Sequence, residues 1–291
     1  MTVKPSRGRP PRSRARRRPR LTRRGRIVVV LTAATVAATA VLLPFLLRGA
    51  DEEPPPPTRS VTLVIPEGWR AHQVYAAVDK VLEQPPGTTR SAASTARLAL
   101  PPDARRNPEG YLFPATYPVE ADTTPASLLS FMVNTANQRF GAKAVTAGTR
   151  DGGLSPYQTV GVASIVQAEA DTAEDMGRVA RVIRNRLDAG MPLQMDSTLN
   201  YALGRSTLDT TTEDTRLDSP YNTYERKGVP PTPIGNPGEE AMRAVLDPPK
   251  GDWLYFVTVG PGDTRFTADY EEHRRNVEEF NARRAAERGA G

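Results

Sequence analysis

Cysteine is absent from the 291 residues, and histidine occurs only twice, as His72 and His273. Without cysteine there are no disulfides, so an exported domain would depend on the size of its hydrophobic core. Two histidines so far apart in sequence argue against a zinc site and against nucleophilic catalysis by a Cys/His pair. We therefore expect no metal and no cofactor, and we expect carboxylates, hydroxyls, amides or arginines to carry any chemistry.

Acidic residues are also missing from residues 1–26, which contain eleven arginines and one lysine. The next 21 residues, 27–47, carry no charge at all. As a helix they would reach about 31 Å, which is enough to cross the hydrocarbon core of a bilayer. The basic flank would stay in the cytoplasm. We therefore predict a single-pass protein of the cell membrane with an extracytoplasmic C-terminal domain. The alternatives are a buried core helix and a cleaved signal peptide.

The basic character of the chain resides in this terminal segment. The net charge is +6 for the whole chain, and residues 1–26 contribute +12, so the remaining 265 residues sum to −6. A mildly acidic folded part has the wrong sign for binding phosphates, which argues against a nucleic-acid partner. We expect the Arg- and Pro-rich residues 1–26 to be a disordered cytoplasmic tail that determines topology.

The rest of the chain divides by composition into a linker and two folded parts. Residues 48–59 include four consecutive prolines and predict a semi-rigid linker. A strand at 61–65 and a helix at 71–82 predict a small α+β module over 60–106. Residues 107–291 would form a mixed α+β domain.

Within 107–291, capping signals and apolar periodicity predict most of the elements. Thr124-Pro125 and Ser155-Pro156 should each cap and open a helix, which would end near Arg139 and Ala170. Asn236-Pro237-Gly238-Glu239 repeats this arrangement and should open a third helix, Glu239–Leu246. A helix over 175–188 should place Arg178, Arg181 and Arg184 on a solvated face. A buried strand over 253–259 should pair with 265–267, and an amphipathic helix over 269–284 should close the chain. The long segment 190–238 lacks periodicity, and loops of this length are usually functional or disordered.

Glu169 is the candidate acid. It ends an almost wholly apolar helix, so its carboxyl could face a cleft while partly removed from water, which raises a carboxyl pKa. From spacing alone, a solvated glutamate at a helix end is the simpler interpretation.

Several strings nevertheless resemble the endolytic murein transglycosylases, the MltG or YceG-like family. They are ASIVQAE (Ala163–Glu169), VARVIRNRLDAGMPLQMDSTLNYALG (Val179–Gly204), SPYNTY (Ser219–Tyr224), GVPPTPIGNPG (Gly228–Gly238), LYFV (Leu254–Val257), VTLVIPEGW (Val61–Trp69) and NPEGYLFPATYPV (Asn107–Val119). The resemblance covers about 210 residues in the family's order. It implies a LysM-like character for 60–106, corresponding to the second of the family's two LysM-like halves, and a transglycosylase domain over 107–291.

The resemblance also implies an activity and its residues. Glu169 would be the general acid/base that cleaves the β-1,4 bond between MurNAc and GlcNAc in nascent glycan strands, leaving a 1,6-anhydro-MurNAc end. Gln194, Asp196, Asn222 and Tyr224 could line the sugar cleft or close the loop, and Asn185-Arg186 would fix the helix to the loop. Peptidoglycan strands, the inner membrane and peptidoglycan synthases are the implied partners.

This sequence departs from the family pattern at three positions. Gln167 stands where Glu is frequent, Ala115 where Asp is common, and Ser197 where Pro is common. We expect neither Ala115 nor Ser197 to touch the acid. Two other functions stay open: a noncatalytic peptidoglycan-binding scaffold of the cell-wall synthesis machinery, and a hydrolytic muramidase.

Overall fold

The computed structural model describes residues 61–141, 153–205 and 210–289. The predicted basic tail, the predicted membrane span and the linker lie outside these ranges. Among the described residues no helix is both long enough and apolar enough to cross a membrane.

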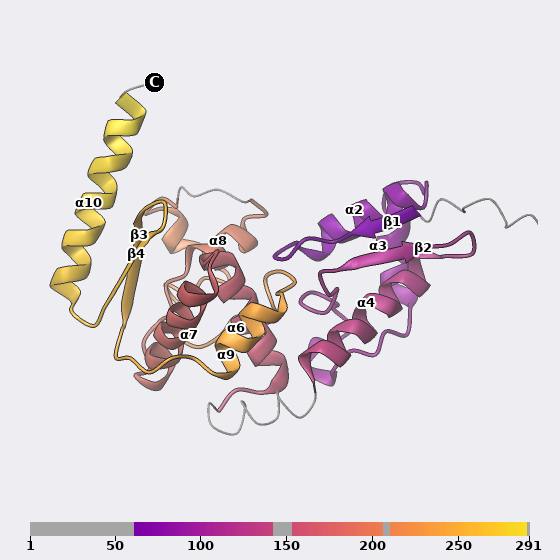
Figure 1. Ribbon diagram of the computed structural model, residues 1–291, viewed down its shortest axis with the longest axis horizontal. Helices are drawn as coiled ribbons and strands as arrows, with labels where there is room; N and C mark the ends of the chain where they lie inside the picture. Colours follow the sequence, from indigo (N-terminus) through magenta and orange to yellow (C-terminus); the bar gives the residue numbers. More distant parts are fainter. Residues whose placement is uncertain (1–60, 142–152, 206–209, 290–291) are drawn as a thin grey trace, which may run out of the picture. The chain divides into compact units, whose positions relative to one another are not determined.

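A two-stranded antiparallel sheet packs with three helices in the first part of the fold (Figure 1). Its elements are β1 (Val61–Val64), α2 (Ala71–Val81), α3 (Thr88–Thr95), the 3₁₀ turn η1 (Pro102–Ala104), β2 (Thr116–Val119) and α4 (Pro125–Phe140). The predicted strand and helix at 61–65 and 71–82 are confirmed as β1 and α2. In the sheet Val61 lies opposite Val119, and Val64 lies opposite Thr116. β2 follows residue 106, so this sheet pairs segments from both sides of the predicted module boundary.

Helices α6 (Pro156–Glu169), α7 (Ala173–Asp188) and α9 (Glu239–Leu246) pack on one another in the second part. The predicted caps of α4 and α6 are confirmed. The Thr124 hydroxyl accepts a hydrogen bond from the Ser127 amide, and the Ser155 hydroxyl accepts one from the Gln158 amide. In both helices proline occupies the first turn, where an amide would have no helical partner.

The predicted bounds of α9, Glu239–Leu246, are confirmed, but its predicted cap is wrong. Gly238 precedes the helix, and no side chain caps it. The Asn236 side chain binds elsewhere: its Oδ1 accepts the Leu112 amide at 2.8 Å, and its Nδ2 donates to the Trp69 carbonyl at 2.7 Å. The Asn236 backbone also exchanges hydrogen bonds with Gly68 and Trp69. This fully buried residue therefore joins three distant segments of the chain.

The solvated arginine face predicted for α7 is also only partly correct. Arg181 donates hydrogen bonds to the carbonyls of Pro248 and Pro249 and so holds the segment that follows α9. Arg178 is half-buried and lies over the Phe266 ring, 5.5 Å from its centroid. Carbonyls and rings supplied by distant segments leave no periodic signal within α7 itself.

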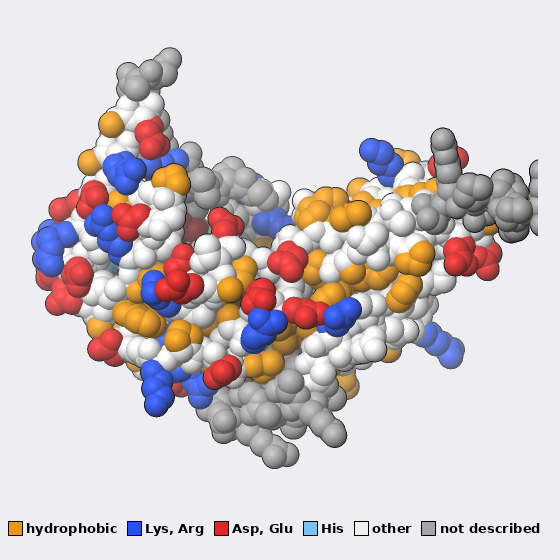
Figure 2. Space-filling view, viewed as in Figure 1, with side chains coloured by type: hydrophobic (Ala, Val, Ile, Leu, Met, Phe, Trp, Pro, Cys, Tyr) orange, Lys and Arg blue, Asp and Glu red, His pale blue; other side chains and the backbone are white. Residues whose placement is uncertain are grey.

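A β-hairpin and a long helix end the chain. β3 (Tyr255–Gly260) pairs antiparallel with β4 (Asp263–Thr267), which confirms the hairpin, although β3 is mostly half-buried rather than buried. The closing helix is confirmed as α10 (Tyr270–Gly289), which packs on β3, but its predicted amphipathic character is wrong, because its apolar and polar residues are not segregated on opposite faces. His273 of α10 stacks on Tyr255 with ring centroids 5.1 Å apart. On the face seen in Figure 2, acidic and basic side chains are interspersed and do not gather by sign.

The segment 190–238, expected to lack regular structure, contains α8 (Asp196–Ala202) and the 3₁₀ turn η2 (Asp214–Arg216). Helix α8 has only seven residues and no side-chain cap. Its Thr198 and Leu199 are fully buried, so packing stabilises it more than local sequence does.

Candidate active site

Glu169 lies at the C-terminal end of helix α6, which runs through the interior of the fold. Nine residues of this helix are buried: Tyr157, Thr159, Val160, Gly161, Val162, Ala163, Ser164, Ile165 and Val166. A helix buried on every face has no freedom to rotate about its axis. Glu169 is its last residue and is half-buried, because the chain leaves helical geometry at Ala170. Packing of α6 therefore fixes where the carboxyl stands.

The amide of Ser197, the second residue of α8, donates a hydrogen bond to Glu169 Oε1 at 3.2 Å. The expectation that Ser197 does not touch the acid is therefore wrong. The two residues are 28 positions apart, and only the return of the chain at α8 brings them together. The Ser197 hydroxyl is buried, and among the described residues it has no partner that satisfies hydrogen-bond geometry.

The surroundings of Glu169 favour its protonated form. Burial raises the pKa of this carboxyl above its usual range, and the nearby negative charge of Asp196 raises it further. The hydroxyl and the amide of Ser197 act in the opposite direction and lower the pKa of Glu169. The amide does so through its hydrogen bond, whereas the hydroxyl lies nearby without a hydrogen bond of suitable geometry. A carboxyl with a raised pKa can hold a proton near neutral pH and deliver it to a substrate.

Asp196 and Tyr224 form a pair beside Glu169. The Tyr224 hydroxyl donates a short hydrogen bond to Asp196 Oδ1, and both side chains are half-buried. Burial raises the pKa of Tyr224, and the charges of Asp196 and Glu169 raise it further, so its hydroxyl stays protonated. The structure thus brings together three of the five predicted site residues.

Thr223 anchors the segment that carries Tyr224 to the start of α8. Its hydroxyl accepts the Met195 amide at 3.0 Å and lies 2.9 Å from the Thr198 hydroxyl. Its carbonyl accepts the Gln194 amide at 2.9 Å. These contacts fix the position of Tyr224 relative to Asp196. The hydroxyl of a threonine next to a predicted site residue was the only hint in the sequence.

The other two predicted residues make different contacts. Asn222 is fully buried, and its Nδ2 donates to the carbonyls of Thr215 and Leu217 at 3.0 and 2.8 Å. Gln194 is exposed, has a positive φ of 53°, and accepts a hydrogen bond from Arg186.

Arg186 confirms the expected link between α7 and the loop. Besides Gln194, this buried guanidinium donates to the carbonyls of Pro192, Leu193 and Leu254. Asn185 donates to the Trp253 carbonyl at 2.8 Å. The two side chains therefore join α7 to the loop before α8 and to the strand that follows α9.

Glu109 is a second buried carboxyl, which the sequence did not indicate. Glu109 is 4% exposed, accepts the Ala71 amide at 2.8 Å, and accepts the Tyr201 hydroxyl at 3.2 Å. Burial raises the pKa of Glu109 to about 7, against the lowering effect of these bonds and of Arg70. Its place in the string NPEGYLFP, between a proline and a glycine, gave no sign of burial.

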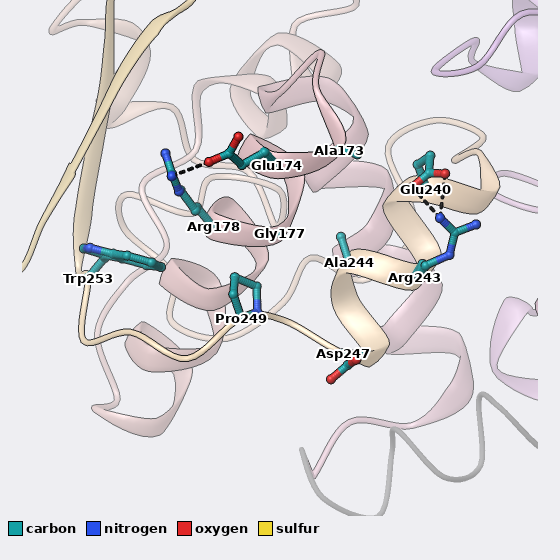
Figure 3. A pocket seen from close by; sticks show the side chains of 10 residues that line it. All are labelled: Ala173, Glu174, Gly177, Arg178, Glu240, Arg243, Ala244, Asp247, Pro249 and Trp253. Atoms are coloured by element: carbon teal, nitrogen blue, oxygen red, sulfur yellow. Dashed lines mark hydrogen bonds and ion pairs between the residues drawn. The ribbon is translucent and has the colours of Figure 1, made fainter.

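A cavity of about 510 Å³ lies elsewhere, between α7 and α9. Figure 3 shows Trp253 at one end, the Glu174–Arg178 ion pair on α7, and the Glu240–Arg243 pair at the other end. Its lining residues are Ala173, Glu174, Gly177, Arg178, Glu240, Arg243, Ala244, Asp247, Pro249 and Trp253. Glu169 is not among them, and two of the three acidic residues of this cavity, Glu174 and Glu240, are already paired with arginine. We therefore place the site at Glu169, where an unpaired carboxyl with a raised pKa stands. Within the described ranges no group of three or more His, Cys, Asp or Glu side chains is arranged to hold a metal ion.

Comparison with known proteins decides the family. The model of the YceG-like family matches residues 41–279. The chain belongs to the YceG-like family. The crystal structure of a YceG-like protein from Listeria monocytogenes superimposes with a TM-score of 0.63 at 30% identity, over 74% of this chain and 75% of that one. The mixed α+β fold class is thereby confirmed.

Two curated relatives of this YceG-like chain carry the name "Endolytic murein transglycosylase". The one from Bacillus subtilis is 36% identical over 173 residues, which is 59% of this chain and 48% of the relative. The one from Streptococcus pneumoniae is 35% identical over 182 residues, which is 60% of this chain and 33% of the relative. The matched part of the YceG-like chain thus spans about half, or a third, of the length of these relatives.

Proposed function

We propose that this YceG-like chain is an endolytic lytic transglycosylase that cleaves the β-1,4 bond between MurNAc and GlcNAc in peptidoglycan strands. The observation that carries the proposal is the Glu169 carboxyl, which is half-buried at the end of a fully packed helix and has a raised pKa. The activity named for the relatives from Bacillus subtilis and Streptococcus pneumoniae supports the same reaction.

One carboxyl suffices for this reaction. Protonated Glu169 donates its proton to the glycosidic oxygen as the bond to C1 of MurNAc breaks and C1 gains oxocarbenium character. The resulting carboxylate then takes the proton of the C6 hydroxyl of the same MurNAc, and the C6 oxygen bonds to C1. The products are a free GlcNAc 4-hydroxyl and a 1,6-anhydro-MurNAc end, with no water consumed. The attacking hydroxyl belongs to the substrate, so its effective concentration is high.

Asp196 and Tyr224 would line the sugar cleft beside the acid. The Asp196 carboxylate places negative charge near the developing oxocarbenium ion and, through its effect on the Glu169 pKa, keeps the acid protonated. The exposed Gln194 could contact sugar, whereas Asn222, with its Nδ2 bound to two loop carbonyls, would shape the loop.

The setting of the reaction follows from the sequence. Residues 27–47 would span the inner membrane, with residues 1–26 in the cytoplasm and the linker 48–59 carrying the rest of the chain outside. Residues 60–106 would act as a LysM-like module ahead of the catalytic residues 107–291. Peptidoglycan synthases that make nascent strands at the same membrane would be partners.

Hydrolysis is a second candidate because a second carboxylate, Asp196, lies near Glu169. Hydrolytic glycosidases use two carboxyls, one as acid and one as base or nucleophile. The hydrogen bond from Tyr224 occupies Asp196 Oδ1 and disfavours that role, but Oδ2 remains available.

Mass spectrometry of the fragments released from purified glycan strands by the full-length chain tests the proposal. Lytic cleavage gives ends that lack a water relative to hydrolytic ends and take up no ¹⁸O from labelled water. Reducing MurNAc ends that contain ¹⁸O would establish the hydrolase. Binding of strands without any release of fragments would establish the noncatalytic scaffold.

A further inference from the structure

Ser197 stands between two groups that act on Glu169. It follows Asp196 directly in α8, and its own amide is the group that donates to Glu169 Oε1. Since this amide lies in the first turn of α8, the helix offers it no carbonyl partner. The hydrogen bond to Glu169 therefore competes with no helical bond.

The bond has a defined consequence for the carboxyl. With Oε1 accepting the Ser197 amide, the proton of the acid form belongs on Oε2, which is the oxygen left to face a substrate. An amide donor binds a carboxylate more strongly than it binds a neutral carboxyl. The bond is therefore strongest after Glu169 has given up its proton.

We propose that Ser197 is a positioning residue that holds the Glu169 carboxyl by its backbone amide and stabilises the carboxylate formed when the glycosidic oxygen takes the proton. The inference rests on the proposed function of Glu169. It assigns the hydrogen bond to the peptide N–H and not to the hydroxyl, which has no partner of suitable geometry among the described residues. A proline at position 197 cannot supply this bond, because proline has no N–H.

Other groups act on the same carboxyl. Asp196 of α8 raises the pKa of Glu169, and Tyr224 from the following loop interacts with it through charge. Arg186 of α7 in turn acts on Tyr224. A substitution at Ser197 changes none of these groups, so their effects on the Glu169 pKa are the same in the wild type and in variants at position 197.

The test compares Ser197→Pro, which removes both the amide and the hydroxyl, with Ser197→Ala, which removes only the hydroxyl. Position 197 lies in the first turn of α8, where proline is compatible with helical geometry, and thermal unfolding checks that the proline variant folds. We expect Ser197→Pro to lower kcat on the order of tenfold, the usual effect of one hydrogen bond to a charged group. It should also move the alkaline limb of the pH–rate profile to higher pH, because loss of the donor raises the Glu169 pKa. Ser197→Ala removes the hydroxyl, which also lowers the Glu169 pKa, but keeps the amide, so it should move the limb in the same direction by less than Ser197→Pro does. Equal shifts of the limb in the two variants, or no shift in either, would overturn the inference.

A measurement on the wild-type full-length chain needs neither activity nor a variant at Ser197. The Ser197 amide proton, followed by ¹H–¹⁵N NMR, should move downfield with the same midpoint as the Glu169 carboxyl carbon, and this titration should vanish in Glu169→Gln. An amide resonance that does not follow the carboxyl would overturn the inference even if Glu169 proves to be the acid. Conversely, if Glu169 is not the catalytic acid, Glu169→Gln will keep its activity. The NMR titration does not depend on activity and would still test the hydrogen bond from Ser197.

Discussion

The carboxylate of Glu109 accepts a hydrogen bond from the hydroxyl of Tyr201, 92 residues further along the chain. The Arg70 guanidinium lies 5.1 Å above the ring of the same tyrosine and also attracts Glu109. A buried carboxyl thus joins the start of α2 to the end of α8. Burial of this carboxyl raises its pKa and so makes stability depend on pH.

The free energy of unfolding should fall as pH rises from about 5 to about 7.5. The Glu109 pKa is raised from 4.5 to about 7, so over this window the folded chain retains a proton that the unfolded chain has lost. The integrated loss is on the order of 3 kcal/mol. Urea unfolding at several pH values measures it. Glu109→Gln should remove this contribution and leave that of Glu169, whose pKa burial also raises, whereas Glu120→Gln, at an exposed carboxyl, should leave the dependence unchanged. A dependence as steep in Glu109→Gln as in the wild type would contradict the assignment to Glu109.

Loss of the carboxyl of Glu169 should abolish cleavage without unfolding the chain. Glu169→Gln keeps the size of the side chain and an oxygen for the Ser197 amide but cannot donate the proton. Because the same group acts as acid and as base, the rate of release of anhydro ends should fall by about 10⁴-fold, the upper end for such groups. Glu174→Gln and Asp175→Asn, on the following helix, are the controls and should retain most activity. Near wild-type release by Glu169→Gln would contradict the assignment.

Asp196→Asn separates the two candidate reactions. Asparagine can still accept the Tyr224 hydrogen bond but removes the negative charge that raises the Glu169 pKa, so the alkaline limb of the pH–rate profile should move to lower pH. For a lytic enzyme the rate at the optimum should change by less than about tenfold. For a hydrolase that uses Asp196 as its base, the rate should fall by about 10²–10⁴-fold.

A side chain at Gly110 should destabilise the fold through a steric clash, and Gly228 is a matched control without that clash. Gly110 and Gly228 share a φ of +85°, but a Cβ at Gly110 would lie 2.5 Å from Pro233 Cγ, and one at Gly228 would meet nothing within 4 Å. Both alanine variants should pay about 1–2 kcal/mol for the left-handed backbone. Gly110→Ala should lose about 1–3 kcal/mol more through overpacking. Equal denaturation midpoints for the two variants would refute this account.

Membrane topology can be tested by fusions. A reporter active only in the cytoplasm should work when fused before Met1 and fail when fused after Gly291, because twelve positive charges precede the apolar run 27–47. The opposite pattern would reverse the orientation and remove peptidoglycan as the substrate.

Features encoded within a few residues were predictable from the sequence. The caps at Thr124 and Ser155 each join residues three positions apart, so the letters alone indicate the helix starts. The apolar run that ends at Glu169 likewise predicts a buried helix with a carboxyl at its end. The resemblance to a family then supplied a role for that carboxyl, which spacing could not.

Contacts between distant segments were decided by the tertiary structure. Ser197 shows this for the site, because its amide reaches Glu169 only where α8 returns to the end of α6. Nearly every residue has a backbone N–H, so the residue type at position 197 does not indicate this hydrogen bond. Asn236 shows it for the fold, since its position before a proline resembles a cap while its side chain binds Leu112 and Trp69. Polar groups removed from water must find whichever partner the packing brings near, and at these positions that partner lies tens of residues away in the chain.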